Sequence, residues 1–122
     1  MLNKVVLIGR LTKDPDLRYT NNEKAVCTFS LAVDSGWGDN KRTDYINIVV
    51  WGKPGENAGK YLAKGKMAAV DGRLQIRSYD DKEGNKRYVT EVVADKVVFL
   101  SPVNAEKANE SAEPWPEEDY PF

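Results

Sequence analysis

The chain has 122 residues, of which 41% are hydrophobic and 30% charged, a composition typical of one soluble globular domain. It contains one cysteine, Cys27, and no histidine, which excludes an intramolecular disulfide, Ser-His-Asp and Cys-His catalysis and the usual zinc sites. Residues 1–103 carry 17 Lys and Arg against 13 Asp and Glu, whereas residues 104–122 carry 1 against 6. We therefore expect a mildly basic body that attracts polyanions and an acidic tail with a different role.

Several functional classes lack their sequence signals. No apolar run approaches a membrane span and residues 1–4 make a poor signal-peptide start, so we expect a cytoplasmic protein. The Gly-Lys pairs lack the G-x-x-x-x-G-K-[ST] spacing of a phosphate-binding loop. The acidic pairs Asp80-Asp81 and Asp14 with Asp16 stand beside Gly or Pro and are interpreted as solvated turns. We expect no metal and no cofactor.

The first third of the chain predicts two strands and two connections. Residues 3–12 are a β-rich run ending at the turn signal Lys13-Asp14-Pro15, and residues 16–24 are expected to be irregular. In residues 25–34 apolar positions alternate with polar ones, which predicts a half-buried strand with Cys27 as a small core residue. The loop at residues 35–42 holds Trp37 between two glycines, where it either caps the core or reaches a ligand.

Residues 43–53, TDYINIVVWGK, predict a third strand around which the chain is organised. Its two-residue period separates two faces, one with Ile46, Ile48 and Val50 and the other with Tyr45, Asn47, Val49 and Trp51. The first face is typical of a core. The second carries large aromatic rings at both ends, and such rings are flat platforms on which nucleotide bases stack.

The second half of the chain predicts one helix and two further strands. Residues 54–64 read as a short helix that begins at Pro54 and ends before Gly65. Residues 66–79 form the fourth strand, with Arg73, Gln75, Arg77 and Tyr79 on one face and Val70, Leu74 and Ile76 on the other. After a polar turn at residues 80–85, residues 86–100 form a long fifth strand whose apolar positions change parity, so we expect a bulge.

This order of elements predicts an all-β fold. Five strands with one short helix between the third and fourth are typical of the OB-fold, a five-stranded Greek-key barrel, which we assign to residues 1–103. Residues 104–122 lack strand periodicity and are expected to be a disordered linker and acidic tail. The last six residues are either a docking peptide or a solvating tail: Glu117, Glu118, Asp119, Tyr120, Pro121 and Phe122.

Several segments carry a resemblance to a known family. They are NKVVLIGRLTKDPDLRY at 3–19, FSLAV at 29–33, W…D…INIVVWGK at 37–53, YLAKG at 61–65, GRL at 72–74, RYVTEVVA at 87–94 and the terminal EEDYPF. With these segments the chain resembles the bacterial single-stranded DNA-binding proteins over essentially its whole length. The resemblance implies a non-catalytic homotetramer that binds single-stranded DNA in the nucleoid and recruits replication, recombination and repair proteins through the last six residues.

The resemblance also assigns roles to individual residues. Carried over by position, the base-stacking aromatics are Trp37, Tyr45, Trp51 and Tyr79. Tyr45 and Tyr79 stand where some members have tryptophan, which leaves a smaller ring for each stack. The linker after Val103 is shorter than is usual, about 13 residues with a reach of roughly 20 Å, as in a short-tailed or phage-encoded member.

Phosphate contacts are expected from basic residues on or beside the aromatic face. The candidates are Arg10, Arg42, Lys53, Arg73 and Arg77, and the alternative for each is an ordinary solvated charge. Two rival functions remain at this point. An OB-fold reader of structured RNA would prefer RNA through its 2′-hydroxyl groups. An OB-fold nuclease would need clustered acids on the binding face, where the sequence offers Arg, Asn, Gln and aromatic residues instead.

Overall fold

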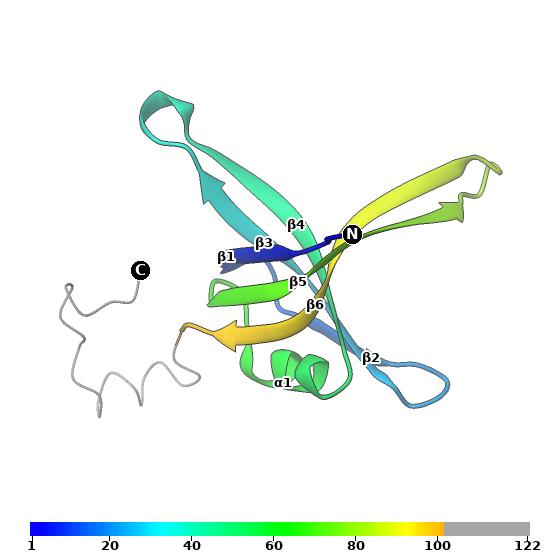
Figure 1. Ribbon diagram of the computed structural model, residues 1–122. Helices are drawn as coiled ribbons and strands as arrows, with labels where there is room; N and C mark the ends of the chain where they lie inside the picture. The colour runs from blue at the N-terminus through cyan, green and yellow to red at the C-terminus, as the bar shows by residue number, and fades with distance from the viewer. Residues whose placement is uncertain (102–122) are drawn as a thin grey trace.

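The computed structural model describes residues 1–101. The expected linker, the six-residue tip and the end of the predicted domain at residue 103 lie outside the described residues. Figure 1 shows the described elements in chain order: β1 (Val5–Leu11), β2 (Asp16–Tyr19), β3 (Ala25–Ser35), the 3-10 turn η1 (Gly38–Asn40), β4 (Arg42–Trp51), α1 (Lys53–Tyr61), β5 (Met67–Asp80) and β6 (Lys86–Phe99).

The strands form one sheet that closes on itself. Their order is β1-β5-β6-β4-β3-β2, and β1 also pairs with β3 at Arg10 and Leu11, which joins the two sides of the barrel. β4 and β6 run parallel, whereas the other pairs are antiparallel. This is the Greek-key barrel of the OB-fold, with α1 between the strands that correspond to the predicted third and fourth. The predicted fold class is confirmed.

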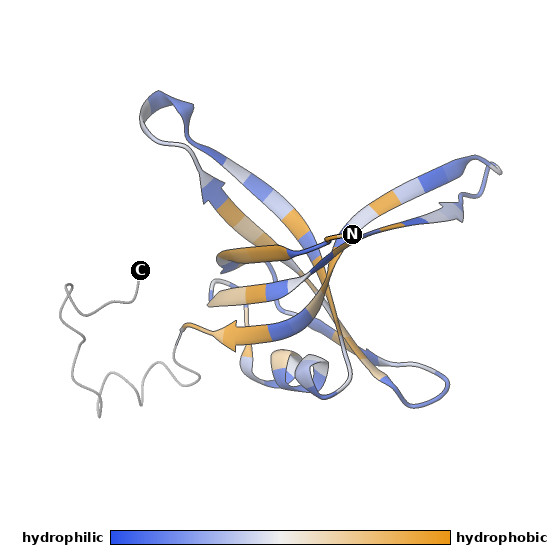
Figure 2. Ribbon diagram, in the orientation of Figure 1, coloured by the Kyte–Doolittle hydropathy of each residue, from blue (hydrophilic) through white to orange (hydrophobic). Residues whose placement is uncertain are grey.

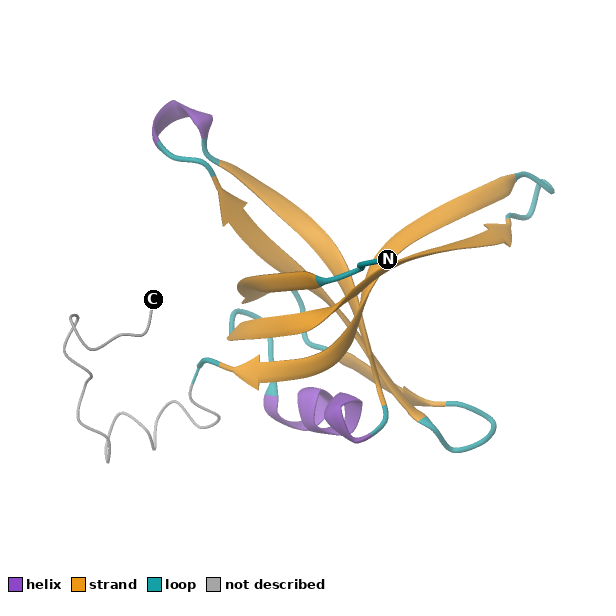
Figure 3. Ribbon diagram, viewed as in Figure 1, coloured by secondary structure: helices purple, strands orange, loops and turns teal. Residues whose placement is uncertain are grey.

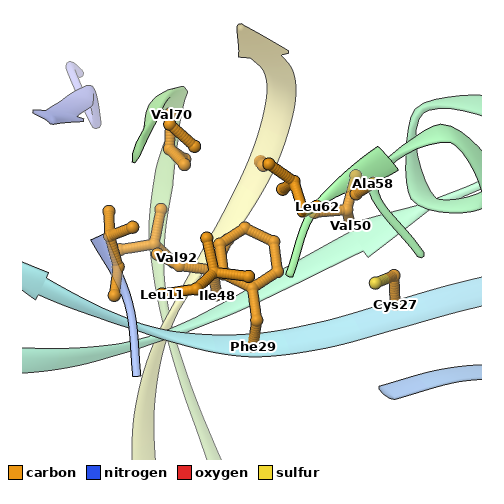
Figure 4. Packing of buried hydrophobic residues seen from close by; sticks show 12 residues of the cluster. Leu11, Cys27, Phe29, Ile48, Val50, Ala58, Leu62, Val70 and Val92 are labelled. Atoms are coloured by element: carbon orange, nitrogen blue, oxygen red, sulfur yellow. The ribbon is translucent and has the colours of Figure 1, made fainter. Parts of the chain in front are cut away.

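A single apolar cluster fills the barrel. Alternate residues of the strands point inward, so that Leu31, Ile48, Val50, Val70 and Val92 are fully buried. Figure 4 shows side chains from the strands and from α1 directed into this cluster. The helix contributes Ala58, and Leu62 follows one turn later at its C-terminal cap, so α1 covers one end of the barrel.

Two expectations about local structure need correction. Residues 16–19 are strand β2 rather than an irregular connection, because they pair with β3 from Asp16 opposite Thr28 to Tyr19 opposite Ala25. Leu17 packs against the core, and a Cβ on Gly59 of α1 would come within 2.8 Å of its side chain. The helix ends at Tyr61 rather than Lys64, because Leu62 already has an extended backbone.

The expected bulge lies in β6. Asp71 pairs with Lys96 and Gly72 with Ala94, which leaves Asp95 as the extra residue, so the prediction is confirmed. Gly72 lies directly opposite this irregularity. A Cβ at that position would come within 2.2 Å of the Val93 carbonyl oxygen, so the close approach of the two strands requires glycine.

Two hairpins project from the barrel as diverging arms (Figures 1 and 3). We call them the β3–β4 arm, which ends in η1, and the β5–β6 arm, which ends in the turn at residues 81–85. Their outer ends are mainly hydrophilic (Figure 2). Leu74 and Ile76 keep the parity of buried Val70, yet they are 43% and 63% exposed because β5 continues past the barrel into its arm. The described helices are too short and too polar to cross a membrane.

Candidate nucleic-acid interface

The outward side chains of β3, β4, β6 and β5 make one continuous surface, which we call the outer face. Paired residues of neighbouring strands lie on the same side of a sheet. Thr28 pairs with Val49, Val49 with Val93, and Val93 with Arg73. This row crosses four strands, and the arms extend it on two sides. The outer face is therefore long enough to hold an extended ligand.

All four predicted stacking residues are solvent-exposed. Tyr45 is 69% and Trp51 47% exposed on the outward side of β4, and Tyr79 is 48% exposed on the corresponding side of β5. Trp37 precedes η1 at the tip of the β3–β4 arm and is 85% exposed, so it does not cap the core. Both arms thus present exposed aromatic rings. The alternative interpretation, that these rings pack in the core, is wrong.

The predicted phosphate-binding residues are distributed unevenly. Arg73 and Arg77 lie on the outer face of β5. Arg10 pairs with Ala32, and Ala32 pairs with Tyr45, so Arg10 lies on the same side of the sheet as Tyr45. The Nη1 of Arg10 donates a hydrogen bond to the Gly65 carbonyl oxygen at 3.1 Å.

Of the other two candidates, Lys53 lies at the margin of the outer face and Arg42 lies off it. Lys53 lies beside Trp51 in a shallow hollow and forms an ion pair with Glu56 at 3.5 Å. Arg42 has the parity of Ile46, so it lies on the opposite side of the β3–β4 arm from Tyr45, where it faces Asp44 at 3.6 Å. The structure thus places four of the five candidates near the aromatic residues, and Arg42 is the exception. The four are Arg10, Lys53, Arg73 and Arg77.

A cleft of about 380 Å³ opens on the outer face between β4 and the foot of the β5–β6 arm. Apolar Val49 and Val89 lie next to the polar groups of Thr28, Ser30 and Asn47 in its lining. Its remaining lining residues are Lys13, Asp14, Asp16, Phe29, Ile48, Arg77 and Glu91. A cleft with both apolar and hydrogen-bonding walls can hold a base or a sugar-phosphate unit.

Glu91 is the residue of this cleft that sequence reasoning missed. It is only 6% exposed, and its Oε1 accepts hydrogen bonds from Arg77 Nε at 2.9 Å and from Gln75 Nε2 at 3.4 Å. Its signal in the sequence is an acid directly before the apolar residues Val92, Val93 and Ala94 of β6. A carboxylate buried there needs a charged or hydrogen-bonding partner.

Arg87 was also missed, and it helps to fix the tip of the β5–β6 arm. Its Nε donates to Asp81 Oδ2 at 2.9 Å, while Asp81 Oδ1 accepts from the backbone N–H groups of Glu83 and Asn85, both at 2.9 Å. The hydrogen bond from Asn85 is the main cause that lowers the pKa of Asp81, and the Arg87 guanidinium adds to it. The turn that follows Tyr79 is therefore held by an ionised carboxylate.

Cys27 has no part in the outer face. It is fully buried on the inward side of β3, as predicted for a small core residue. Burial raises the pKa of its thiol to about 11, with a smaller contribution from the negative charge of Asp16. Within residues 1–101 no group of three or more His, Cys, Asp and Glu side chains is placed to hold a metal ion.

Comparison with known proteins decides the family. A family model described as the single-strand binding protein family matches residues 2–100, which is most of the chain. The chain belongs to this family. The resemblance inferred from its motifs is confirmed. The outer face therefore belongs to the barrel of a single-strand binding protein family member.

Named relatives agree with this assignment. The Listeria monocytogenes single-stranded DNA-binding protein 2 is 55% identical over 107 residues, which cover 85% of this chain and 67% of the relative. The Bacillus cereus single-stranded DNA-binding protein is 53% identical, over 85% of this chain and 63% of the relative. The Staphylococcus aureus single-stranded DNA-binding protein 2 is 56% identical, over 88% and 79%. This member of the family thus spans less than two thirds of the Bacillus cereus relative.

Proposed function

We propose that this member of the single-strand binding protein family binds single-stranded DNA without sequence preference, protects it and catalyses no reaction. The observation that carries the proposal is the outer face, where exposed aromatic rings from both arms share one side of the sheet with Arg73 and Arg77. The relatives that are named for single-stranded DNA binding support the choice of ligand. We place the protein in the cytoplasm, at the nucleoid.

Base stacking supplies affinity in this proposal. Each base stacked on an aromatic ring contributes about 1–3 kcal/mol, and every base has a flat face, so stacking accepts any sequence. Tyr45 and Trp51 are six residues apart on one strand, a spacing of about 20 Å that leaves room for several nucleotides. Tyr79 and Trp37 extend the track along the two arms.

Phosphate contacts supply the rest of the affinity and make it depend on salt. Arg73 and Arg77 lie on the outer face and are proposed as direct contacts, as are Arg10 on the side of the sheet that carries Tyr45 and Lys53 at the margin. Arg42 contributes through its charge alone, because it lies on the opposite side of its arm. Each direct contact to a single strand steepens the fall of log K with log salt by about 0.7.

Assembly into a homotetramer, which the family resemblance implies, is also proposed, and one uncovered side of the barrel supports the pairing of two of its subunits. β1 pairs with β5 along Val5–Arg10 but meets β3 only at Arg10 and Leu11, so no strand of residues 1–101 pairs with the other edge of its first half. Val6 and Ile8 are exposed beside this edge. An unpaired edge flanked by apolar side chains is a ready template for a second copy, and we propose that β1 pairs with β1 of another subunit.

Recruitment of replication, recombination and repair proteins is proposed for residues 117–122. Three acids followed by Tyr120, Pro121 and Phe122 offer charge and an aromatic ring to a basic, apolar pocket. The test compares the full chain with a chain lacking these six residues and with Phe122→Ala. We expect both variants to lose binding to purified replication or repair proteins and to keep DNA binding. If both variants still bind these proteins as the full chain does, this part of the proposal is wrong.

The central test is tryptophan fluorescence during titration with oligo-dT. Trp115→Phe removes the one tryptophan outside the described residues, so the signal then reports Trp37 and Trp51. We expect strong quenching by DNA at submicromolar concentration, weaker quenching by an RNA oligomer and weaker binding at high salt. Preference for RNA would favour an RNA reader instead, and no quenching by either polymer would overturn the assignment of the outer face.

A further inference from the structure

We infer that Glu91 is a positioning residue for single-stranded DNA: it holds the Arg77 guanidinium by Nε and thereby directs the terminal nitrogens of Arg77 to a phosphate. This inference rests on the proposed function. It assigns a role to an acid that lies in the path of an anionic ligand, where charge alone would be unfavourable. The same carboxylate also accepts a hydrogen bond from Gln75 on the neighbouring strand β5.

The burial of Glu91 shows that this acid is built into the outer face. Among residues 1–101 it is the one charged side chain that is buried. A buried carboxylate destabilises a fold unless a charged partner and hydrogen bonds compensate it, and here Arg77 Nε lies 2.9 Å from Oε1. Half of the Arg77 side chain stays exposed, so the pair is anchored at the carboxylate and open at the guanidinium.

The geometry of arginine explains what this anchor does. A guanidinium is a rigid planar fork, so fixing Nε fixes the plane and the direction of the two terminal nitrogens. Neither terminal nitrogen of Arg77 has a partner among residues 1–101, and the side chain lines the cleft with Ser30 and Asn47. A phosphate in the cleft can then take two hydrogen bonds from a group that is already oriented.

Gln75 extends the effect to a second arginine. Its Nε2 donates to Glu91 Oε1 at 3.4 Å, and its Oε1 accepts from Arg73 Nη1 at 3.5 Å. Both contacts are longer than that of Arg77, so they orient more weakly. The chain Arg73, Gln75, Glu91, Arg77 nevertheless connects the two basic residues of β5 through one buried carboxylate on β6.

For the Glu91→Gln variant, the inference predicts a change in DNA affinity opposite to the one that net charge alone predicts. Glu91→Gln keeps the size of the side chain and removes a negative charge from the outer face, which by itself strengthens binding of a polyanion. A positioning role predicts weaker binding, because the neutral amide oxygen of glutamine holds a guanidinium less firmly than a carboxylate does. Asp44→Asn is the matched control, because it removes one negative charge from an exposed arginine pair on the opposite side of the β3–β4 arm.

The experiment titrates the full chain and its variants with a short oligo-dT at four salt concentrations. We expect Glu91→Gln and Arg77→Gln each to weaken binding about threefold to tenfold and to lower the slope of log K against log salt by about 0.7. The double variant is expected to bind no more weakly than Arg77→Gln alone. Asp44→Asn is expected to bind as the unmodified chain or slightly more tightly.

Arg77→Lys keeps the inference testable if Glu91→Gln fails to fold. Lysine keeps the charge but has no fork to be oriented, so we expect weaker binding than arginine gives. Binding by Glu91→Gln or Arg77→Lys equal to that of the unmodified chain, with an unchanged salt slope, overturns the inference, as do additive effects in the double variant. No DNA binding by the unmodified chain overturns the proposed function and this inference with it.

Discussion

Replacing Ile48 with Val and Tyr45 with Ala perturbs opposite sides of the same strand, β4. Ile48 is fully buried in the barrel, and removing one methylene from such a site costs about 0.5–1.5 kcal/mol of folding free energy. For a domain of this size that lowers Tm by about 2–12 °C. Tyr45 is mostly exposed, so its removal changes stability by less than about 0.5 kcal/mol. Loss of one stacked base instead costs about 1–3 kcal/mol, or about 5-fold to 150-fold in Kd.

The assay measures both quantities for both variants. Thermal unfolding is followed at one fixed protein concentration, because the proposed assembly makes Tm depend on concentration. DNA affinity is measured at 25 °C with a short oligonucleotide, so that contacts made by other subunits do not mask the loss of one ring. Ile48→Val is expected to lower Tm and keep Kd, whereas Tyr45→Ala keeps Tm and raises Kd.

Tyr45→Phe is the matched control for the ring. It removes only the hydroxyl group and keeps the flat face, so its Kd is expected to stay close to that of the unmodified chain. If Tyr45→Ala lowers Tm as much as Ile48→Val, the assignment of the two sides of β4 is wrong. If Tyr45→Ala leaves Kd unchanged, the side assignment stands but Tyr45 is no platform for a base.

Three further predictions concern single sites away from the stacking residues. Gly72→Ala should cost about 1–3 kcal/mol, measured by denaturant unfolding, because its Cβ would meet the Val93 carbonyl oxygen at 2.2 Å. The folded-state pKa of Asp81 is lowered, so the ionised carboxylate stabilises the β5–β6 turn above the unfolded pKa of 3.8, and this stabilisation is lost as pH falls below 3.8. Faster amide exchange of Asn85 at low pH would report the loss. The thiol of Cys27 has a pKa raised to about 11, so it should resist alkylation at pH 8 until the chain unfolds, and stability should fall as pH rises from about 9 to 11.

Strand periodicity predicted most of the barrel correctly, and β4 shows why. Its two sides differ sharply in character, so the two-residue period alone separated buried Ile48 and Val50 from exposed Tyr45 and Trp51. The change of parity in the last strand predicted the bulge that leaves Asp95 unpaired. In each case the signal lies within one segment of the chain and needs no knowledge of its neighbours.

Features that depend on neighbouring strands were not predicted. β2 has only four residues, too few to show a period, and it is a strand because β3 offers a pairing edge and α1 leaves room for Leu17 at Gly59. The exposure of Ile76 follows from how far β5 continues past the barrel, which its alternation does not reveal. The pairing of Arg77 with Glu91 joins residues of two strands, so it depends on their register.

The β5–β6 arm presents different side chains on its two sides. Because the sides of a strand alternate, β5 presents exposed Leu74 and Ile76 on one side of the arm and Arg77 and Tyr79 on the other. Residues on an exposed two-stranded ribbon are held weakly unless one side is packed, since an isolated hairpin is marginally stable in water. A subunit contact that covers Ile76, in addition to the proposed pairing of β1, would therefore stiffen the arm and hold Arg77 and Tyr79 in place for DNA. Assembly and DNA binding are then coupled through one hairpin, although no residue needs to touch both partners.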